Sequence, residues 1–260
     1  MKQLPNLVAL FALELAMLMM GCNKSASNPA ATNAKSQAEA YFKVDASIAG
    51  SISGLIRYTG PRPKVKSVDM SDDPSCVDAN RGKVYSDSIV IGPRGGLANA
   101  FIYIQKGLEG KTFAPPPTPV IIEQKGCMFR PHVLGLQTGQ TLQIVNSDPV
   151  THNIHPMPQL NREWNHTQGS GDPPMAHKFT KAEVMVPVKC NIHGWMHAYF
   201  GVLDHPYFAV SGEDGRFAIP SLPPGTYTLA AWTQTLGVEQ QTITVSPKSN
   251  TTVDFTFRGK

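Results

Sequence analysis

Three residue types that bind soft metal ions lie on one short loop between two segments with strand character. The loop carries Cys190, His193 and Met196, each three residues after the one before. The flanking segments 183–189 and 198–203 are apolar and bounded as β-strands usually are. Two strands joined by such a tight loop hold its side chains close together, so the fold must be one in which a sheet presents this loop at one end.

A fourth candidate, His152, lies upstream after another segment with strand character. Residues 139–146 alternate polar and apolar side chains, and the turn formers of 146–149 follow them. We therefore expect His152 at a strand end. A soft thiolate, two imidazoles and a weak axial thioether make up the ligand set of a blue-copper centre. The sequence predicts one type 1 copper site formed by His152, Cys190, His193 and Met196.

These residues resemble those of the cupredoxin family, the plastocyanin-like copper proteins, and the loop spacing is most similar to that of amicyanins. The resemblance implies a Greek-key β-sandwich over residues 111–206. It also implies equatorial ligation by His152, Cys190 and His193, with Met196 as the axial ligand.

The same resemblance makes further predictions about the surroundings of the ligands. It gives Asn153 the role of tying the two ligand-bearing loops together by hydrogen bonds. Gly194 departs from the family pattern, because many members carry Pro there. In an electron carrier we expect a partly exposed edge of His193, ringed by Pro156 and Trp195, as the exit for electrons.

Three further histidines, His155, His197 and His205, crowd the same part of the chain. We expect them on a polar loop surface, since a surface histidine needs no metal to explain it. The alternative is a five-coordinate or non-blue site that uses His155 or His197.

The N-terminus has the features of an export signal. Lys2 precedes an apolar run over residues 7–20, shorter than the roughly 18 residues of a membrane span, and Gly21-Cys22 follows. This resembles a bacterial lipoprotein box, which implies a signal peptide over residues 1–21 and lipidation of Cys22. An ordinary cleaved signal peptide is the alternative. We expect residues 22–45 to be a flexible linker. We expect the protein to reside in the periplasm or cell envelope, lipid-anchored to a bacterial membrane, with secretion as the alternative.

The cysteine count is consistent with an oxidising compartment. If Cys22 carries lipid and Cys190 binds copper, Cys76 and Cys127 remain as one disulfide pair. A competing hypothesis is a second metal site formed by Cys127, Met128 and His132.

Composition favours an all-β protein with almost no helix. The chain has 22 Gly, 22 Pro and only 16% charged residues, and past the N-terminal run no long stretch has the apolar period of a helix. Its net charge of +4 is scattered, which argues against nucleic-acid binding.

A second unit is predicted from segments near both ends. Residues 214–217 (DGRF) and 222–227 (LPPGTY) resemble the carboxypeptidase regulatory-like domain, a smaller transthyretin-like β-sandwich, and 50–54 (GSISG) resembles its opening strand. We expect the domain to be split into 46–110 and 207–260, with the copper domain inserted between them. In the alternative, two domains follow in tandem and 46–110 supplies the first cupredoxin strands.

Three functions follow from these features. The first is a membrane-anchored carrier of single electrons whose partner is a cytochrome or a copper- or quinol-linked oxidoreductase. The second is a copper chaperone or store that uses Met157, Met175, Met185 and the additional histidines. The third is a metal-free surface module that binds carbohydrate or a partner. We do not expect an enzyme, because four protein ligands leave the metal no open position.

Overall fold

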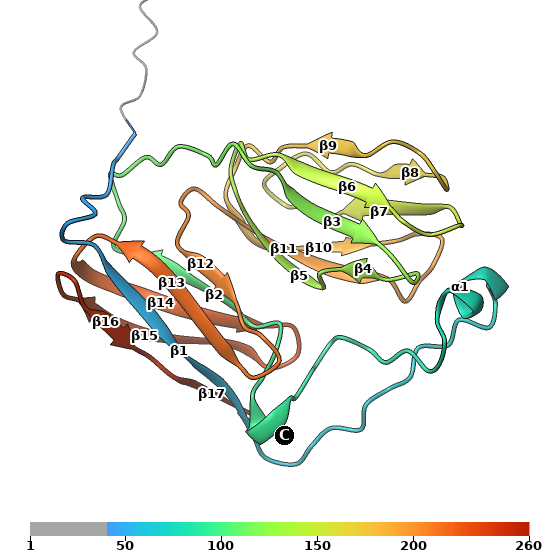
Figure 1. Cartoon of the computed structure of the whole chain (residues 1–260), viewed down its shortest axis with the longest axis horizontal. Coiled ribbons are helices and arrows are strands. Elements are labelled where there is room, and N and C mark those ends of the chain that lie inside the picture. The colour runs from blue at the N-terminus through green and yellow to red at the C-terminus, as the bar shows by residue number, and fades with distance from the viewer. Residues whose placement is uncertain (1–40, 260) are drawn as a thin grey trace, which may run out of the picture. The chain divides into compact units, whose positions relative to one another are not determined.

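The computed structural model describes residues 41–259, and their regular secondary structure is almost entirely β-strand (Figure 1). Within this range the helices are a short α-helix, α1 (Pro74–Ala79), and a 3-10 helix, η1 (Pro93–Gly95). The all-β prediction is therefore confirmed. No helix among the described residues is long and apolar enough to cross a membrane.

One β-sandwich, here named the terminal sandwich, combines strands from both ends of the described chain. One of its sheets has the order β13-β1-β16, with β17 also paired to β1, and the other has the order β12-β2-β14-β15. The strands are β1 (Gly50–Thr59), β2 (Phe101–Lys106), β12 (Phe208–Val210), β13 (Arg216–Leu222), β14 (Gly225–Thr233), β15 (Gly237–Val245), β16 (Asn250–Thr252) and β17 (Phe255–Arg258).

The early strands β1 and β2 belong with the late ones. β1 pairs antiparallel with β13 and parallel with β16 and β17, while β2 pairs antiparallel with β12 and β14. Their inward side chains fill one core with those of the late strands; Ile52, Ile102, Ile219 and Leu229 are all buried in it. The early and late strands therefore share both sheets and one core. In the sheets of residues 41–259, neither early strand pairs with a strand of the segment between them and β12.

The second sandwich, here named the central sandwich, is formed by that intervening segment. Its sheets have the orders β5-β11-β10-β7-β8 and β4-β3-β6-β9. The strands are β3 (Val120–Gln124), β4 (Phe129–Arg130), β5 (Val133–Gln137), β6 (Leu142–Asn146), β7 (His152–Pro156), β8 (His166–Gln168), β9 (Met175–His177), β10 (Glu183–Lys189) and β11 (His197–Leu203).

The segments predicted as strands around the candidate ligands match this sandwich closely. The predicted 183–189 is β10, and 198–203 is β11 apart from one residue. The strand expected over 139–146 begins only at Leu142, because Gly139 has a positive φ of 77° and the Gln140 amide donates to the Gln137 carbonyl, closing a turn.

The two sandwiches share a small hydrophobic cluster that includes Phe101 and Ala230 of one and Val133 and Leu203 of the other. Glycine makes this contact possible on the central side. A Cβ atom on Gly201 would lie 2.2 Å from the Phe101 ring, and one on its strand partner Gly135 would lie 2.3 Å from the Phe208 ring. Any larger side chain at either position would push the aromatic rings away.

The segment between β1 and β2 leaves the terminal sandwich and contacts the central one. Met70 and Cys76 are buried in the central core. Cys76 forms a disulfide with Cys127, which lies just before β4. The helix α1 is therefore tied to the same sandwich as the candidate ligands.

Candidate metal centre

Backbone hydrogen bonds shape the loop between β10 and β11. The amide of Cys190 donates to the Met196 carbonyl (3.1 Å), and the amide of Met196 donates to the His193 carbonyl (3.0 Å). The His193 amide in turn donates to Cys190 Sγ (3.3 Å). Because the two ends of the loop are hydrogen-bonded to each other where β10 ends and β11 begins, the loop side chains are held at fixed positions.

His152, Cys190 and His193 converge in the interior of the central sandwich. Nδ1 of His152 lies 2.9 Å from Nδ1 of His193, and Cys190 Sγ lies 3.9 Å from the same His193 nitrogen. One ligand atom from each of the three residues falls within 4.8 Å of the others. The three residues are 0%, 2% and 3% exposed, so the group is closed to solvent.

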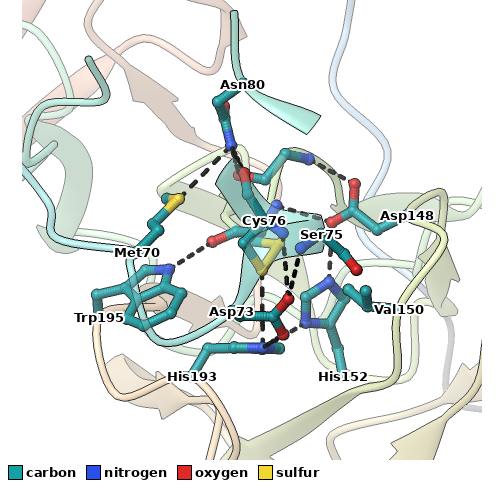
Figure 2. The surroundings of a disulfide bond; sticks show 12 residues. Met70, Asp73, Ser75, Cys76, Asn80, Asp148, Val150, His152, His193 and Trp195 are labelled. Carbon is teal, nitrogen blue, oxygen red and sulfur yellow. Dashed lines mark hydrogen bonds and ion pairs between the residues drawn. A yellow bond between two sulfur atoms is a disulfide. The ribbon is translucent and has the colours of Figure 1, made fainter. Parts of the chain in front are cut away.

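Each imidazole is held at its outer nitrogen by a carboxylate (Figure 2). Nε2 of His152 lies 2.8 Å from Asp148 Oδ2, and Nε2 of His193 lies 2.9 Å from Asp73 Oδ2. Each carboxylate accepts a hydrogen bond from the Nε2–H group that faces it, which leaves Nδ1 of each ring to face the interior. Two acceptor nitrogens then point at one another, and a proton or a metal cation between them removes their repulsion.

Asp148 is fixed before it meets His152. Its two oxygens accept hydrogen bonds from the backbone amides of Gly126 and Cys127, both at 2.7 Å. Burial raises the pKa of Asp148, but the hydrogen bond to His152 and the two amides outweigh it, so that the net pKa lies below the ordinary value. Asp148 is therefore an anionic, immobile partner for the imidazole.

The charges of the group respond to one another. Burial lowers the pKa of His152, but the hydrogen bonds to Asp148 and Cys190 raise it to about 9. Burial likewise raises the pKa of the Cys190 thiol, whereas hydrogen bonds from His152 and the Asn153 amide lower it to about 7. Cys190 thus reaches the thiolate form, the one that binds metals, near neutral pH.

Asn153 lies where a link between the two ligand segments is needed. Its Oδ1 accepts the amide proton of Asn191, the residue after Cys190, at 2.5 Å, and its Nδ2 donates to Asn165 Oδ1 at 2.6 Å. The side chain is 4% exposed. This part-buried hydrogen bond joins the start of β7 to the ligand loop, as the family resemblance implies for this residue.

Met196 is fully buried in the same core cluster as Cys190. The neighbouring Trp195 donates from Nε1 to the Cys127 carbonyl (2.9 Å), and its ring centroid lies 5.1 Å from that of His193. The loop is therefore fastened to the backbone at the disulfide as well as to its own strands.

The prediction of a partly exposed His193 edge is wrong. His193 is only 3% exposed, since Asp73 and Cys76 cover its outer nitrogen; Cys76 Sγ lies 3.7 Å from Nε2. Both residues come from the segment between β1 and β2, which the sequence did not link to the loop.

Sequence reasoning missed the two carboxylates altogether. Asp148 could have been found from its position four residues before His152, but Asp73 lies 120 residues from His193 and carries no such signal.

The additional histidines differ from one another. His197 is exposed, as expected for a loop surface, and His155 is half-buried with its Nε2 at 2.5 Å from Glu163 Oε1. His205 contradicts the expectation: it is 6% exposed and its Nε2 lies 2.9 Å from the Ile104 carbonyl. None of these three belongs to the groups of close metal-ligating side chains found among the described residues.

The structure pairs Cys76 with Cys127, with their Cα atoms 5.6 Å apart. The competing metal site would need Cys127 as a thiolate, and its sulfur is already bonded. The third member of that set, His132, instead places its nitrogens 3.1 Å from the His197 carbonyl and 2.7 Å from Gln234 Oε1. Cys22 and the predicted signal peptide lie outside the described residues.

Two of the comparisons with known proteins found similar families or structures. The family model of the carboxypeptidase regulatory-like domain matches residues 203–258, which confirms that resemblance for the late strands. No curated protein matches the chain.

Among solved structures, the chain is similar to cupredoxins. A copper-containing nitrite reductase from Thermus scotoductus SA-01 is 25% identical over 39% of this chain, which spans only 25% of the reductase, with a TM-score of 0.32. A purple cupredoxin from Nitrosopumilus maritimus is 21% identical over 32% of this chain and 98% of its own, with a TM-score of 0.28. An amicyanin variant in the reduced state is 15% identical over 39% and 97%, with a TM-score of 0.30. Likeness at this level assigns no role to any residue, which must come from the geometry of the site.

That geometry fits a copper ion. The three converging atoms are one thiolate sulfur and two imidazole nitrogens, the soft and borderline donors that copper prefers over the oxygen ligands of magnesium or calcium. The donors are buried, and both outer nitrogens have their partners, so all three ligand atoms are free to face the same point.

Proposed function

We propose that this protein is a type 1 copper protein that carries single electrons. The observation that supports this most strongly is the closed group of His152, Cys190 and His193, whose inward atoms lie within 4.8 Å of one another. These three residues would hold the metal in the equatorial positions. Met196, buried beside them on the same loop, would be the axial ligand.

A bound copper ion would supply a one-electron couple between Cu(II) and Cu(I). The contacts around the ligands would hold them in nearly the same positions in the two states. Asp148 and Asp73 fix the two imidazoles, the Cys190 amide is bonded across the loop, and Asn153 ties that loop to β7. Ligands held by such outer contacts reorganise little when the charge of the metal changes.

The burial of the ligands separates this proposal from a copper-handling role. A chaperone or store exchanges its metal with partners and needs accessible ligands, whereas the three here are at most 3% exposed. Of the three methionines that copper transfer would use, Met185 is buried in the small cluster between the two sandwiches, which contains none of these ligands. Metal exchange would have to open the site first.

The cellular setting is part of the proposal. The N-terminal features support export and lipid attachment at Cys22 in a bacterial envelope, and the Cys76–Cys127 disulfide fits an oxidising compartment. The partner would be another redox protein, a cytochrome or a copper- or quinol-linked oxidoreductase. The proposed four-ligand set leaves no open metal position for a substrate, so we propose a carrier rather than an enzyme.

The proposal is tested by visible absorption and electron paramagnetic resonance of the Cu(II)-loaded protein beside its Cys190→Ser variant. A type 1 centre gives an intense red-end band and a narrow copper hyperfine splitting, both lost in the variant. Asn191→Ser, an exposed change in the same loop that keeps the thiolate, serves as the matched control. A pale or widely split spectrum of the wild-type protein would instead favour copper handling or a metal-free module.

A further inference from the structure

The two outer carboxylates reach the site by different routes. Asp148 lies four residues before His152, in the turn between β6 and β7, so the contact is local. Asp73 comes from the segment between β1 and β2, which otherwise connects two strands of the terminal sandwich. A contact between residues so far apart in the chain exists only because something holds that segment against the central sandwich.

Several contacts hold this segment against the central sandwich. The disulfide joins Cys76 of α1 to Cys127, and Asn80 at the end of α1 donates from Nδ2 to the carbonyls of Cys76 (2.8 Å) and Gly126 (2.9 Å). Met70 packs into the central core. We call residues 68–80 the cap. Figure 2 shows the disulfide and Asp73 together at the outer edge of His193.

Asp73 divides its two oxygens between two tasks. Oδ1 accepts the backbone amide protons of Ser75 (2.9 Å) and Cys76 (3.2 Å) and so caps the start of α1. Oδ2 faces Nε2 of His193 at 2.9 Å. The helix and the imidazole are therefore positioned by the same carboxylate, and neither can shift without disturbing the other.

We propose that Asp73 is a positioning residue for His193 and that the cap is a disulfide-anchored closure over the His193 edge of the metal centre. The inference rests on the proposed copper function. A ring that binds metal through Nδ1 carries its proton on Nε2, and Asp73 accepts that proton in a hydrogen bond. The protein itself thereby supplies the hydrogen-bond partner of this ring edge, and a redox partner meets the cap rather than the imidazole.

Two substitutions at Asp73 separate its tasks. Asp73→Ser keeps an N-cap hydroxyl but is too short to reach His193. Asp73→Asn keeps both length and an oxygen for the N-cap, so its amide group turns toward the Nε2 proton of His193, donor against donor. Asp72→Asn removes the same charge from the exposed neighbouring residue and is the control.

The first measurement is the Cu(II) dissociation constant of the full-length protein by competition with a chelator. We expect it to rise about 10–100-fold in both Asp73 variants, as is typical when the outer partner of a metal-binding histidine is lost. We expect less than a two-fold change in Asp72→Asn. Equal dissociation constants in all four proteins, with equal melting temperatures, would overturn the role of Asp73.

Two measurements on the metal-free protein keep this inference separate from the proposed function. Nitrogen-15 chemical shifts of the His193 ring should report a protonated Nε2 in the wild type and in Asp72→Asn, and mixed tautomers in Asp73→Ser. Alkylation of Cys190, followed by mass spectrometry of its peptide, should be at least about ten-fold faster in Cys76→Ala/Cys127→Ala, because loss of the anchor opens the site.

These measurements distinguish failure of the proposed function from failure of the cap inference. If the wild type binds copper without a type 1 spectrum, the electron-carrier function fails, while the ring tautomer and the alkylation rate still decide whether Asp73 and the disulfide position and close the site. If the spectrum is type 1 but tautomer, alkylation rate and dissociation constant are unmoved by these variants, the cap inference fails alone.

Discussion

Buried polar side chains serve two different ends in this protein, and each sandwich has an example of one. In and beside the terminal sandwich, Ser211 bonds to the Leu97 carbonyl and accepts from the Ala100 amide, so its hydroxyl completes the backbone. In the central sandwich, His152 and His193 also satisfy their outer nitrogens but leave two inward nitrogens 2.9 Å apart. Buried polar atoms that are fully paired stabilise a fold, whereas donor atoms that converge on one point can bind a cation.

Cys190→Ser should change the copper site of the central sandwich more than any other substitution, because it removes the soft thiolate ligand. We expect the intense visible band of the copper-loaded protein to vanish altogether, while the free energy of unfolding of the metal-free protein changes little. The measurement is an absorption spectrum with a urea titration alongside. A variant that kept the band would refute the assignment of Cys190 as ligand.

Removing the disulfide tests how far the central sandwich depends on the segment between β1 and β2. The bond spans a sequence separation of 51 residues, and closing a loop of that length stabilises the folded state by about 4 kcal/mol on chain-entropy grounds. We expect Cys76→Ala/Cys127→Ala to lose up to that amount in denaturant unfolding. A loss below ~1 kcal/mol would mean that the cap is held by its other contacts.

A matched pair of core truncations distinguishes the sandwiches by function. Ile219 and Ile154 are both fully buried, one in each core. Changing either to Ala should cost about 3 kcal/mol of unfolding free energy. Ile219→Ala should leave copper affinity unchanged, whereas Ile154→Ala, two residues after His152, should weaken it. Equal effects on copper affinity would contradict a site confined to the central sandwich.

The rate at which Cys190 is alkylated should depend on pH, and this dependence tests whether the site activates the thiol. Hydrogen bonds that outweigh burial bring its thiol pKa to about 7, so the reactive thiolate increases as the pH rises through 7 and is lost below it. Alkylation of Cys190 in the metal-free protein should therefore have its midpoint near pH 7. In the same protein unfolded by guanidinium, the midpoint should move to about 8.5. A shared midpoint would show that the site does not activate the thiol.

Met196→Leu should have the smallest effect. Leucine fills nearly the same volume in the buried position, so we expect a stability loss under about 1.5 kcal/mol. The type 1 colour should persist while the reduction potential measured by redox titration changes, because the axial ligand tunes the centre more than it holds the metal. Loss of colour would show that Met196 does more than an axial ligand.

The sequence alone determined the features that depend on neighbouring residues. The spacing of Cys190, His193 and Met196 and the strand patterns beside them indicated a ligand loop, and the structure has that loop between β10 and β11. The count of cysteines favoured the Cys76–Cys127 pair that the structure contains. The motifs at 214–227 indicated the regulatory-like domain that the family model matches. Local spacing carries this information because a tight loop or turn fixes the positions of its own residues.

Only the tertiary structure decided which surfaces close over the site. Pairing of β1 with β13, β16 and β17 unites strands separated by the whole central sandwich, and the segment that follows β1 carries Asp73 to His193. No periodicity or motif connects residues 120 positions apart. Their contact depends on the disulfide, on α1 and on the packing of Met70, and these act together only in the folded chain.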